Sequence, residues 1–155
     1  MLCIFFKSTG PALIRHIESG QTIDHRYYIE NCLQPLIDEI KSQRPSSGTH
    51  GVKIHSDNAT PHRHRVVLDY LELEGLTIVP HPPNSPDLAP CDFWLFDLIK
   101  QNIGDQTDSD SLLRAVTDFL YSLDKKEYQK TFDKWIERMK LCVNNEGDYF
   151  EHLMK

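Results

Sequence analysis

The alternation of apolar and polar residues predicts two elements in the first third of the chain. Residues 2–6 and 12–17 are short apolar runs separated by a Gly-Pro turn signal, so this pattern predicts a β-hairpin over 2–17. From residue 24 to 40, apolar side chains recur every three or four positions, which predicts a helix. Pro35 lies within this helix and is expected to kink it.

The middle of the chain alternates between strand and helix patterns. Residues 44–51 form a loop by composition, and 52–57 alternate apolar and polar residues as a strand does. A Thr-Pro pair at 60–61 favours a helix start, with Thr60 as the N-cap, and Gly75 is expected just beyond the end of that helix. Residues 76–79 then predict a short buried strand.

The remainder is a proline-rich loop followed by helices. The loop covers 80–86, and helical patterns follow at 90–104, 111–123 and 127–142. Alternation of strands and helices predicts an α/β fold, a mixed sheet with helices on its faces. We expect Phe132 and Trp135, in the last helix, to lie in the core.

Composition limits the class of protein. The 155 residues suit one domain, and the absence of an apolar run of 18 residues excludes a membrane span. Four scattered cysteines indicate free thiols in a reducing compartment. The net charge of −6 argues against a module whose main task is to grip DNA, although it does not exclude chemistry on DNA.

Two aspartates are candidates for metal chemistry. Asp57 ends a predicted strand, and Asp92 lies in the first turns of a helix, with 34 residues between them. Phosphodiester cleavage commonly uses divalent cations, and Mg²⁺ prefers carboxylate oxygens. Taken alone, an aspartate at a strand end is more often a turn or cap residue, so both interpretations stand at this point.

The residues around these aspartates carry a family resemblance. Asp57 lies in HSDNATPH and Asp92 in PHPPNSPDLAPCDFWLF, and both segments and their 34-residue gap resemble those of mariner-type DNA transposases. The segments at 20–23 and 147–150 are also similar to family segments, so the resemblance spans nearly the whole chain. Asn84 and Cys91 depart from the usual aromatic and serine without touching the carboxylates.

This resemblance implies a ribonuclease-H-like fold and a cut-and-paste reaction. In such a reaction, metal-activated water nicks the transposon end, and the freed 3′ hydroxyl attacks target DNA. Asp57 would be the second metal ligand and Asp92 the third, with Mg²⁺ or Mn²⁺ as the cofactor. The resemblance further implies DNA as the partner, a homodimer as the working form, no membrane association and a nuclear location.

The resemblance also implies that parts are missing. Residues 1–155 match a truncated catalytic domain that lacks its first strand, the first aspartate and the amino-terminal helix-turn-helix region. We therefore expect weak metal binding, a marginally stable or partner-dependent fold and little strand transfer. The alternatives are an inactive, transposon-derived relic that only binds nucleic acid or protein, and an incomplete gene model with coding sequence upstream.

Residues near the two aspartates have competing interpretations. Asn58 is expected to orient Asp57 or, more often in such positions, to cap the next helix, and it is also a candidate for nucleic-acid contact. Arg63, His64 and Arg65 either contact phosphate or form an exposed basic face.

Three further groups of side chains leave two interpretations each. The histidines at 55, 62, 64 and 81 lack the spacing of a structural zinc site, which favours loop and helix-start roles. Asp87 suits a helix start better than a metal. Phe93 and Trp94 suit base stacking or core packing, and we expect Phe96 in the core.

Overall fold

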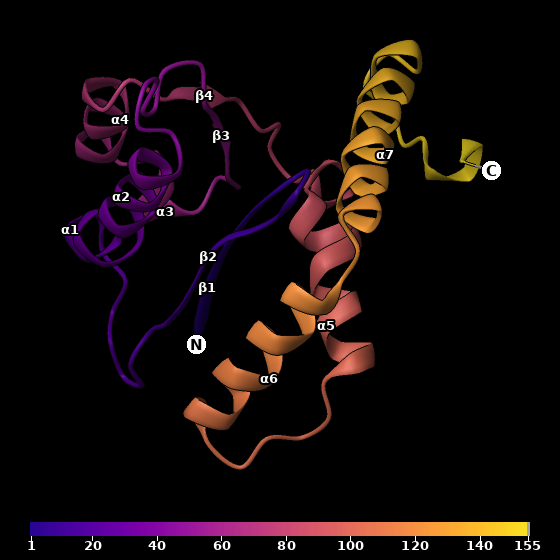
Figure 1. Cartoon of the computed structure of the whole chain (residues 1–155). Coiled ribbons are helices and arrows are strands. Elements are labelled where there is room, and N and C mark those ends of the chain that lie inside the picture. Colours follow the sequence, from indigo (N-terminus) through magenta and orange to yellow (C-terminus); the bar gives the residue numbers. More distant parts are fainter. Residues whose placement is uncertain (155) are drawn as a thin grey trace.

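The strands form two separate pairs. A computed structural model describes residues 1–154. β1 (Leu2–Lys7) and β2 (Gly10–His16) form the antiparallel hairpin, with a bulge between Phe5 and Phe6. β3 (Lys53–His55) and β4 (Thr77–Val79) pair in parallel (Figure 1). Within 1–154 each pair is a two-stranded sheet of its own, so the expected mixed sheet is present in two parts.

The first helical segment contains an irregular turn just before Pro35. It comprises α1 (His25–Tyr28), a π-helical turn (Ile29–Leu33) and α2 (Gln34–Gln43). Asp24 caps α1 by accepting a hydrogen bond from the Tyr27 amide at 2.8 Å. Pro35 has no N–H to donate to the preceding turn, and the π-helical turn lies there, so the predicted irregularity is confirmed.

The second predicted helix is divided in two. α3 (Thr60–Arg63) is followed by α4 (Arg65–Leu73), because the backbone of His64 is extended (ψ 135°). Thr60 is already helical, so its prediction as the N-cap is wrong: Ala59 occupies that position, without a side-chain hydrogen bond. Gly75 has φ +78°, which confirms it as the left-handed residue beyond α4.

The strand after Gly75 is less buried than its composition predicts. β4 is an edge strand, and Ile78 is 37% exposed, whereas Leu76 just before it is 6% exposed. Ile78 is the exposed apolar residue of β4, so the prediction of a buried strand is wrong at this position.

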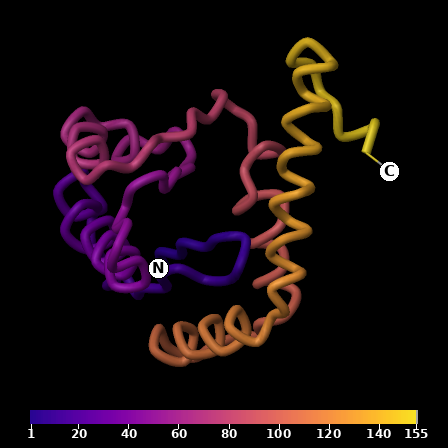
Figure 2. Tube along the Cα trace, turned by 45° about the horizontal axis from the view of Figure 1, so that its top comes forward, coloured from indigo at the N-terminus to yellow at the C-terminus, as the bar shows by residue number. Residues whose placement is uncertain are grey.

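The second half of the chain is helical. A 3₁₀ turn (Pro86–Leu88) and a π-helical turn (Cys91–Leu95) lead into α5 (Phe96–Asn102), and α6 (Ser109–Ser122) and α7 (Lys125–Asn144) follow. A final 3₁₀ turn covers Glu151–Leu153. Figure 2 shows α5 and α7 on the side of the hairpin opposite to α1 and α2.

The hairpin lies between two cores. Cys3, Phe5 and Leu13 pack against the first cluster, which is built by the π turn, α2, α4 and β3. Ile4, Phe6 and Ile14 pack against the second, around Leu95, Val116 and Leu120. This division follows from the alternation of side chains along a strand.

Several expectations about single residues are decided by this packing. Phe132 and Trp135 are partly buried among other aromatic rings, as expected for the core. Phe96 is 47% exposed, so its expected core position is wrong: it starts α5 on the outward face. The four cysteines are free thiols. Among the residues described, no helix has the length and apolar character needed to cross a membrane.

Candidate divalent-metal and nucleic-acid site

Asp57 lies just beyond the end of β3 and is held as a carboxylate. Its Oδ1 accepts a hydrogen bond from the Ala59 amide at 3.0 Å and lies 2.7 Å from His62 Nδ1. Partial burial raises the pKa of Asp57, but the Ala59 amide and the nearby histidines outweigh this, so the pKa lies below its ordinary value. The side chain is 57% exposed and therefore open to a ligand.

Asp92 lies in the π-helical turn that follows Pro90. Burial raises the pKa of Asp92, and the negative charge of Asp57 raises it further. Burial also raises the pKa of the neighbouring Cys91 thiol to about 11, and the charges of both aspartates add to this effect. The charge of Asp57 is thus one of the causes that raise the pKa of both Asp92 and Cys91.

The loop between β4 and Asp92 is tied to the end of β3. The Asn58 side-chain amide donates a hydrogen bond to the His81 carbonyl at 2.9 Å, and His55 Nε2 lies 3.1 Å from His81 Nδ1. The two structural roles predicted for Asn58 are not seen, since it neither caps α3 nor hydrogen-bonds to Asp57. Its position lets it join the strand end to the loop instead.

Helix α7 fixes the far side of the same loop. The Trp135 indole N–H donates to the Leu88 carbonyl at 2.8 Å, and its ring packs against His55 with centroids 4.7 Å apart. The buried Arg138 donates to the Asp87 carbonyl at 2.9 Å and to Glu151 Oε1 at 2.8 Å. α7 therefore determines where the segment that leads into Asp92 lies.

These contacts from α7 are the part of the site that sequence reasoning missed. Trp135 was predicted only as a core residue, and no role was predicted for Arg138. The Arg138 guanidinium also lies 4.3 Å from the centroid of the Phe93 ring, which is therefore engaged within the fold. The amphipathic pattern of α7 predicts which face of the helix points inward, but it does not predict which carbonyl groups the side chains on that face contact.

The basic residues near Asp57 differ in whether their side chains are exposed to solvent or engaged in contacts within the fold. Arg63 is exposed, and Arg65 is exposed and paired with Asp69 at 2.8 Å. His64 caps α4 by accepting from the Val66 amide at 3.3 Å and stacks on His25, with ring centroids 3.7 Å apart. The two arginine side chains are exposed to solvent, whereas the His64 ring is engaged in the fold.

The side chains present suit a hard divalent cation in part. Asp57 and Asp92 are both exposed and carry the carboxylate oxygens that Mg²⁺ prefers as ligands. Among residues 1–154 no group of three or more His, Cys, Asp or Glu side chains is placed to hold a metal ion.

The histidines near the site act mainly through hydrogen bonds and packing. Burial and the neighbouring His81 lower the pKa of His55 to about 4, so the His55 ring is neutral near pH 7. His62 supports Asp57, and its ring packs against Tyr28 with centroids 4.6 Å apart.

Comparison with curated proteins gives two informative matches. The chain is 30% identical to the Mariner Mos1 transposase of Drosophila mauritiana over 97% of its own length and 45% of that protein. It is 27% identical to human histone-lysine N-methyltransferase SETMAR over 97% of the chain and 22% of that protein. The chain thus spans less than half the length of these relatives. No protein-family profile matches it.

Comparison with solved structures extends this similarity to the fold. The Mos1 transposase catalytic domain with raltegravir and Mg superposes with a TM-score of 0.87 and 30% identity, covering 97% of this chain and 76% of that one. The Mos1 paired-end complex with left transposon end gives 0.87 and 29%, covering 97% and 44%. The predicted ribonuclease-H-like fold is confirmed by this likeness, although its strands form two pairs.

Proposed function

We propose that this chain, which belongs to the mariner family of transposases, binds DNA and a divalent cation at the edge shared by Asp57 and Asp92. The binding would serve the cleavage and strand transfer of DNA transposition. The observation that carries the proposal is the likeness of the chain to the Mos1 transposase catalytic domain, at 30% identity and a TM-score of 0.87. The charge of Asp57, which adds to burial in raising the pKa of Asp92, supports the pairing of these two carboxylates. Similarity to a catalytic domain solved with Mg supports the choice of cation.

Each residue has a distinct part in this proposal. Asp57 and Asp92 would hold the cation, which when bound supplies activation of water and stabilisation of the leaving oxygen. His62 keeps Asp57 oriented and ionised through its 2.7 Å contact. Arg63 and Arg65 lie one short helix away and would contact the DNA backbone, where arginine forms paired hydrogen bonds with phosphate.

A second candidate function follows from the small number of side chains that could bind the cation. Among residues 1–154 no group of three or more His, Cys, Asp or Glu side chains is placed to hold a metal ion, so the proposed ligand set consists of Asp57 and Asp92 alone. A chain with this set is proposed to bind nucleic acid or protein while cutting DNA poorly, as an inactive relic would. Little or no strand transfer by the chain alone is the consequence.

The partner and place in the cell are proposed from the relatives. A homologous transposase is solved in a paired-end complex with a transposon end, which supports DNA as the partner and a homodimer as the working form. A nuclear location is proposed because the proposed substrate is DNA.

The test separates metal-dependent binding from cleavage. We would measure binding of a labelled DNA duplex by fluorescence anisotropy with and without Mn²⁺, and nicking of a supercoiled plasmid under the same conditions. We expect Mn²⁺ to strengthen DNA binding in the unmodified chain and in Asp118→Asn, an exposed carboxylate on α6. We expect no strengthening in Asp57→Asn or Asp92→Asn, because each removes one cation ligand.

The nicking assay decides between the two candidate functions. We expect nicking at background level, because two carboxylates leave the cation under-coordinated. Nicking that disappears in Asp57→Ala would contradict the inactive alternative and show that two carboxylates suffice. DNA binding indifferent to Mn²⁺ in every variant would contradict the proposed site itself.

A further inference from the structure

The chain reverses direction after α7 and folds back beside it (Figure 1). Glu146 and Gly147 have left-handed backbone angles (φ 55° and 87°), and the Gly147 amide donates to the Cys142 carbonyl at 2.9 Å. This pattern is a Schellman-type helix end. Phe150 follows and is 1% exposed, so a buried ring anchors the returning segment, residues 147–151, to the rest of the fold.

Glu151 ends this segment in a charged contact with α7. Its Oε1 accepts a hydrogen bond from Arg138 Nη1 at 2.8 Å, and its Oε2 accepts one from the Tyr149 hydroxyl at 3.0 Å. The bond from Arg138, followed by that from Tyr149, lowers the pKa of Glu151 below its ordinary value. Glu151 is therefore a carboxylate near pH 7, and among residues 1–154 it is the acidic side chain that pairs with Arg138.

The Arg138 guanidinium depends on this carboxylate. The Arg138 side chain is buried, and a buried charge is costly unless it is paired and hydrogen-bonded. Its Nε is buried and has no hydrogen-bond partner among the described residues, whereas Nη1 carries the bonds to Glu151 and to the Asp87 carbonyl. Loss of Glu151 would leave the guanidinium without its counter-charge and free to turn away from Asp87.

Arg138 in turn holds both ends of the segment that contains Asp92. Its Nη1 donates to the Asp87 carbonyl at 2.9 Å, and its guanidinium lies 4.3 Å from the centroid of the Phe93 ring. Asp87 lies five residues before Asp92, and Phe93 directly follows Asp92. One guanidinium therefore contacts the chain on either side of the proposed cation ligand.

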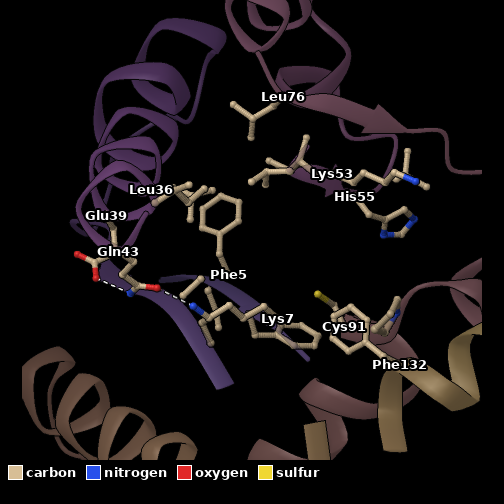
Figure 3. Close-up of a pocket in the computed structure, with 18 of the residues that line it drawn as sticks. Phe5, Lys7, Leu36, Glu39, Gln43, Lys53, His55, Leu76, Cys91 and Phe132 are labelled. Carbon is tan, nitrogen blue, oxygen red and sulfur yellow. Dashed lines mark hydrogen bonds between the residues drawn. The ribbon is translucent and has the colours of Figure 1, made fainter. Parts of the chain in front are cut away.

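The opposite side of this segment gives it little support. Cys91 lines a cavity of about 440 Å³, and Figure 3 shows its sulfur pointing into that space. Open space therefore adjoins the residue before Asp92. The place of Asp92 is set instead by the hydrogen bonds that Trp135 and Arg138 donate to the loop before it.

We propose that Glu151 is a positioning residue for Asp92 and acts through the Arg138 guanidinium with which it pairs. The Glu151 carboxylate holds the guanidinium in place, and the guanidinium holds Asp87 and Phe93 on either side of Asp92. The segment that returns after α7 thus takes part in shaping the proposed cation site. This inference rests on the proposed function in one respect, the role of Asp92 as a ligand of the cation.

Removal of the carboxylate in the full chain tests the proposal. We expect Glu151→Ala to weaken Mn²⁺ binding about tenfold, measured by electron paramagnetic resonance of the free ion, as is usual when a group that orients a metal ligand is lost. Glu151→Gln keeps an oxygen that can accept from Arg138 and should lose less. Glu137→Ala, which removes an exposed carboxylate next to Arg138 on α7, is the matched control and should leave the affinity unchanged.

A second readout does not depend on the cation. The carboxyl-carbon NMR resonance of Asp92 in the metal-free chain should shift in Glu151→Ala and keep its position in Glu137→Ala. This readout separates the inference from the proposed function. A chain that binds no Mn²⁺ would contradict the proposed cation site, and the Asp92 resonance would still decide whether Glu151 positions that side chain.

Two further variants separate positioning from stability. Tyr128→Phe removes a hydrogen bond elsewhere on α7 and should leave both readouts unchanged. In an Arg138→Gln background, Glu151→Ala should have no further effect, because its action passes through the guanidinium. An unchanged Asp92 resonance in Glu151→Ala would overturn the proposal. So would an equal change in Tyr128→Phe, or an undiminished effect of Glu151→Ala in the Arg138→Gln chain.

Discussion

The hydrogen bond from Trp135 to the loop before Asp92 links fold stability to the proposed cation site. Replacing Trp135 by Phe keeps an aromatic ring but removes the donor to the Leu88 carbonyl. Leu88 is only 5% exposed, so its carbonyl loses its partner in a largely dry environment. The unpaired group costs about 1–3 kcal/mol of unfolding free energy. The smaller ring adds a cavity cost on the order of 1 kcal/mol.

Urea unfolding followed by circular dichroism measures this loss, and Mn²⁺ titration measures its effect on the site. We expect Trp135→Phe to lower both the unfolding free energy and the affinity for Mn²⁺. Tyr128→Phe is the matched control, because it deletes another bond from an aromatic donor on α7, to the Leu120 carbonyl at 2.7 Å. Tyr128→Phe should lower the unfolding free energy and leave the affinity for Mn²⁺ unchanged. Equal Mn²⁺ affinities in the two variants would refute the positioning role of Trp135.

Three shorter predictions concern the residues around Asp57. Asp92 should titrate at a higher pH than Asp57 in carboxyl-carbon NMR spectra, so that acid removes the charge of Asp92 first; coincident midpoints would contradict the coupling. Arg63→Gln and Arg65→Gln should each reduce the slope of log DNA affinity against log salt by about 1, and unchanged slopes would exclude phosphate contacts. His64→Ala should lower the unfolding free energy in urea by about 1 kcal/mol, because it removes the cap of α4. Weaker DNA binding with unchanged stability would instead indicate a direct contact between His64 and DNA.

Local pattern was sufficient to predict most of the helices and strands, whereas the role of the two carboxylates stays a prediction. The hairpin, the irregularity before Pro35 and the role of Gly75 depend on neighbouring residues, and all three follow from periodicity or backbone restriction. Asp57 and Asp92 were predicted from strand-end and helix-start positions together with their long motifs.

Contacts between distant residues were beyond prediction. Trp135 reaches a carbonyl 47 positions away, and Arg138 reaches one 51 positions away. An amphipathic pattern predicts which face of a helix is buried but not which carbonyl its donors meet. The exposure of Ile78 likewise depends on which elements cover β4, and Phe96 depends on the rotation of α5.

Binding of Mn²⁺ to the full chain, followed by electron paramagnetic resonance of the free ion, tests the central claim most directly. We expect weak, saturable binding that is lost in both Asp57→Asn and Asp92→Asn and retained in Asp118→Asn. Binding that survives removal of either carboxylate, or that falls equally in Asp118→Asn, would contradict a shared cation site at Asp57 and Asp92.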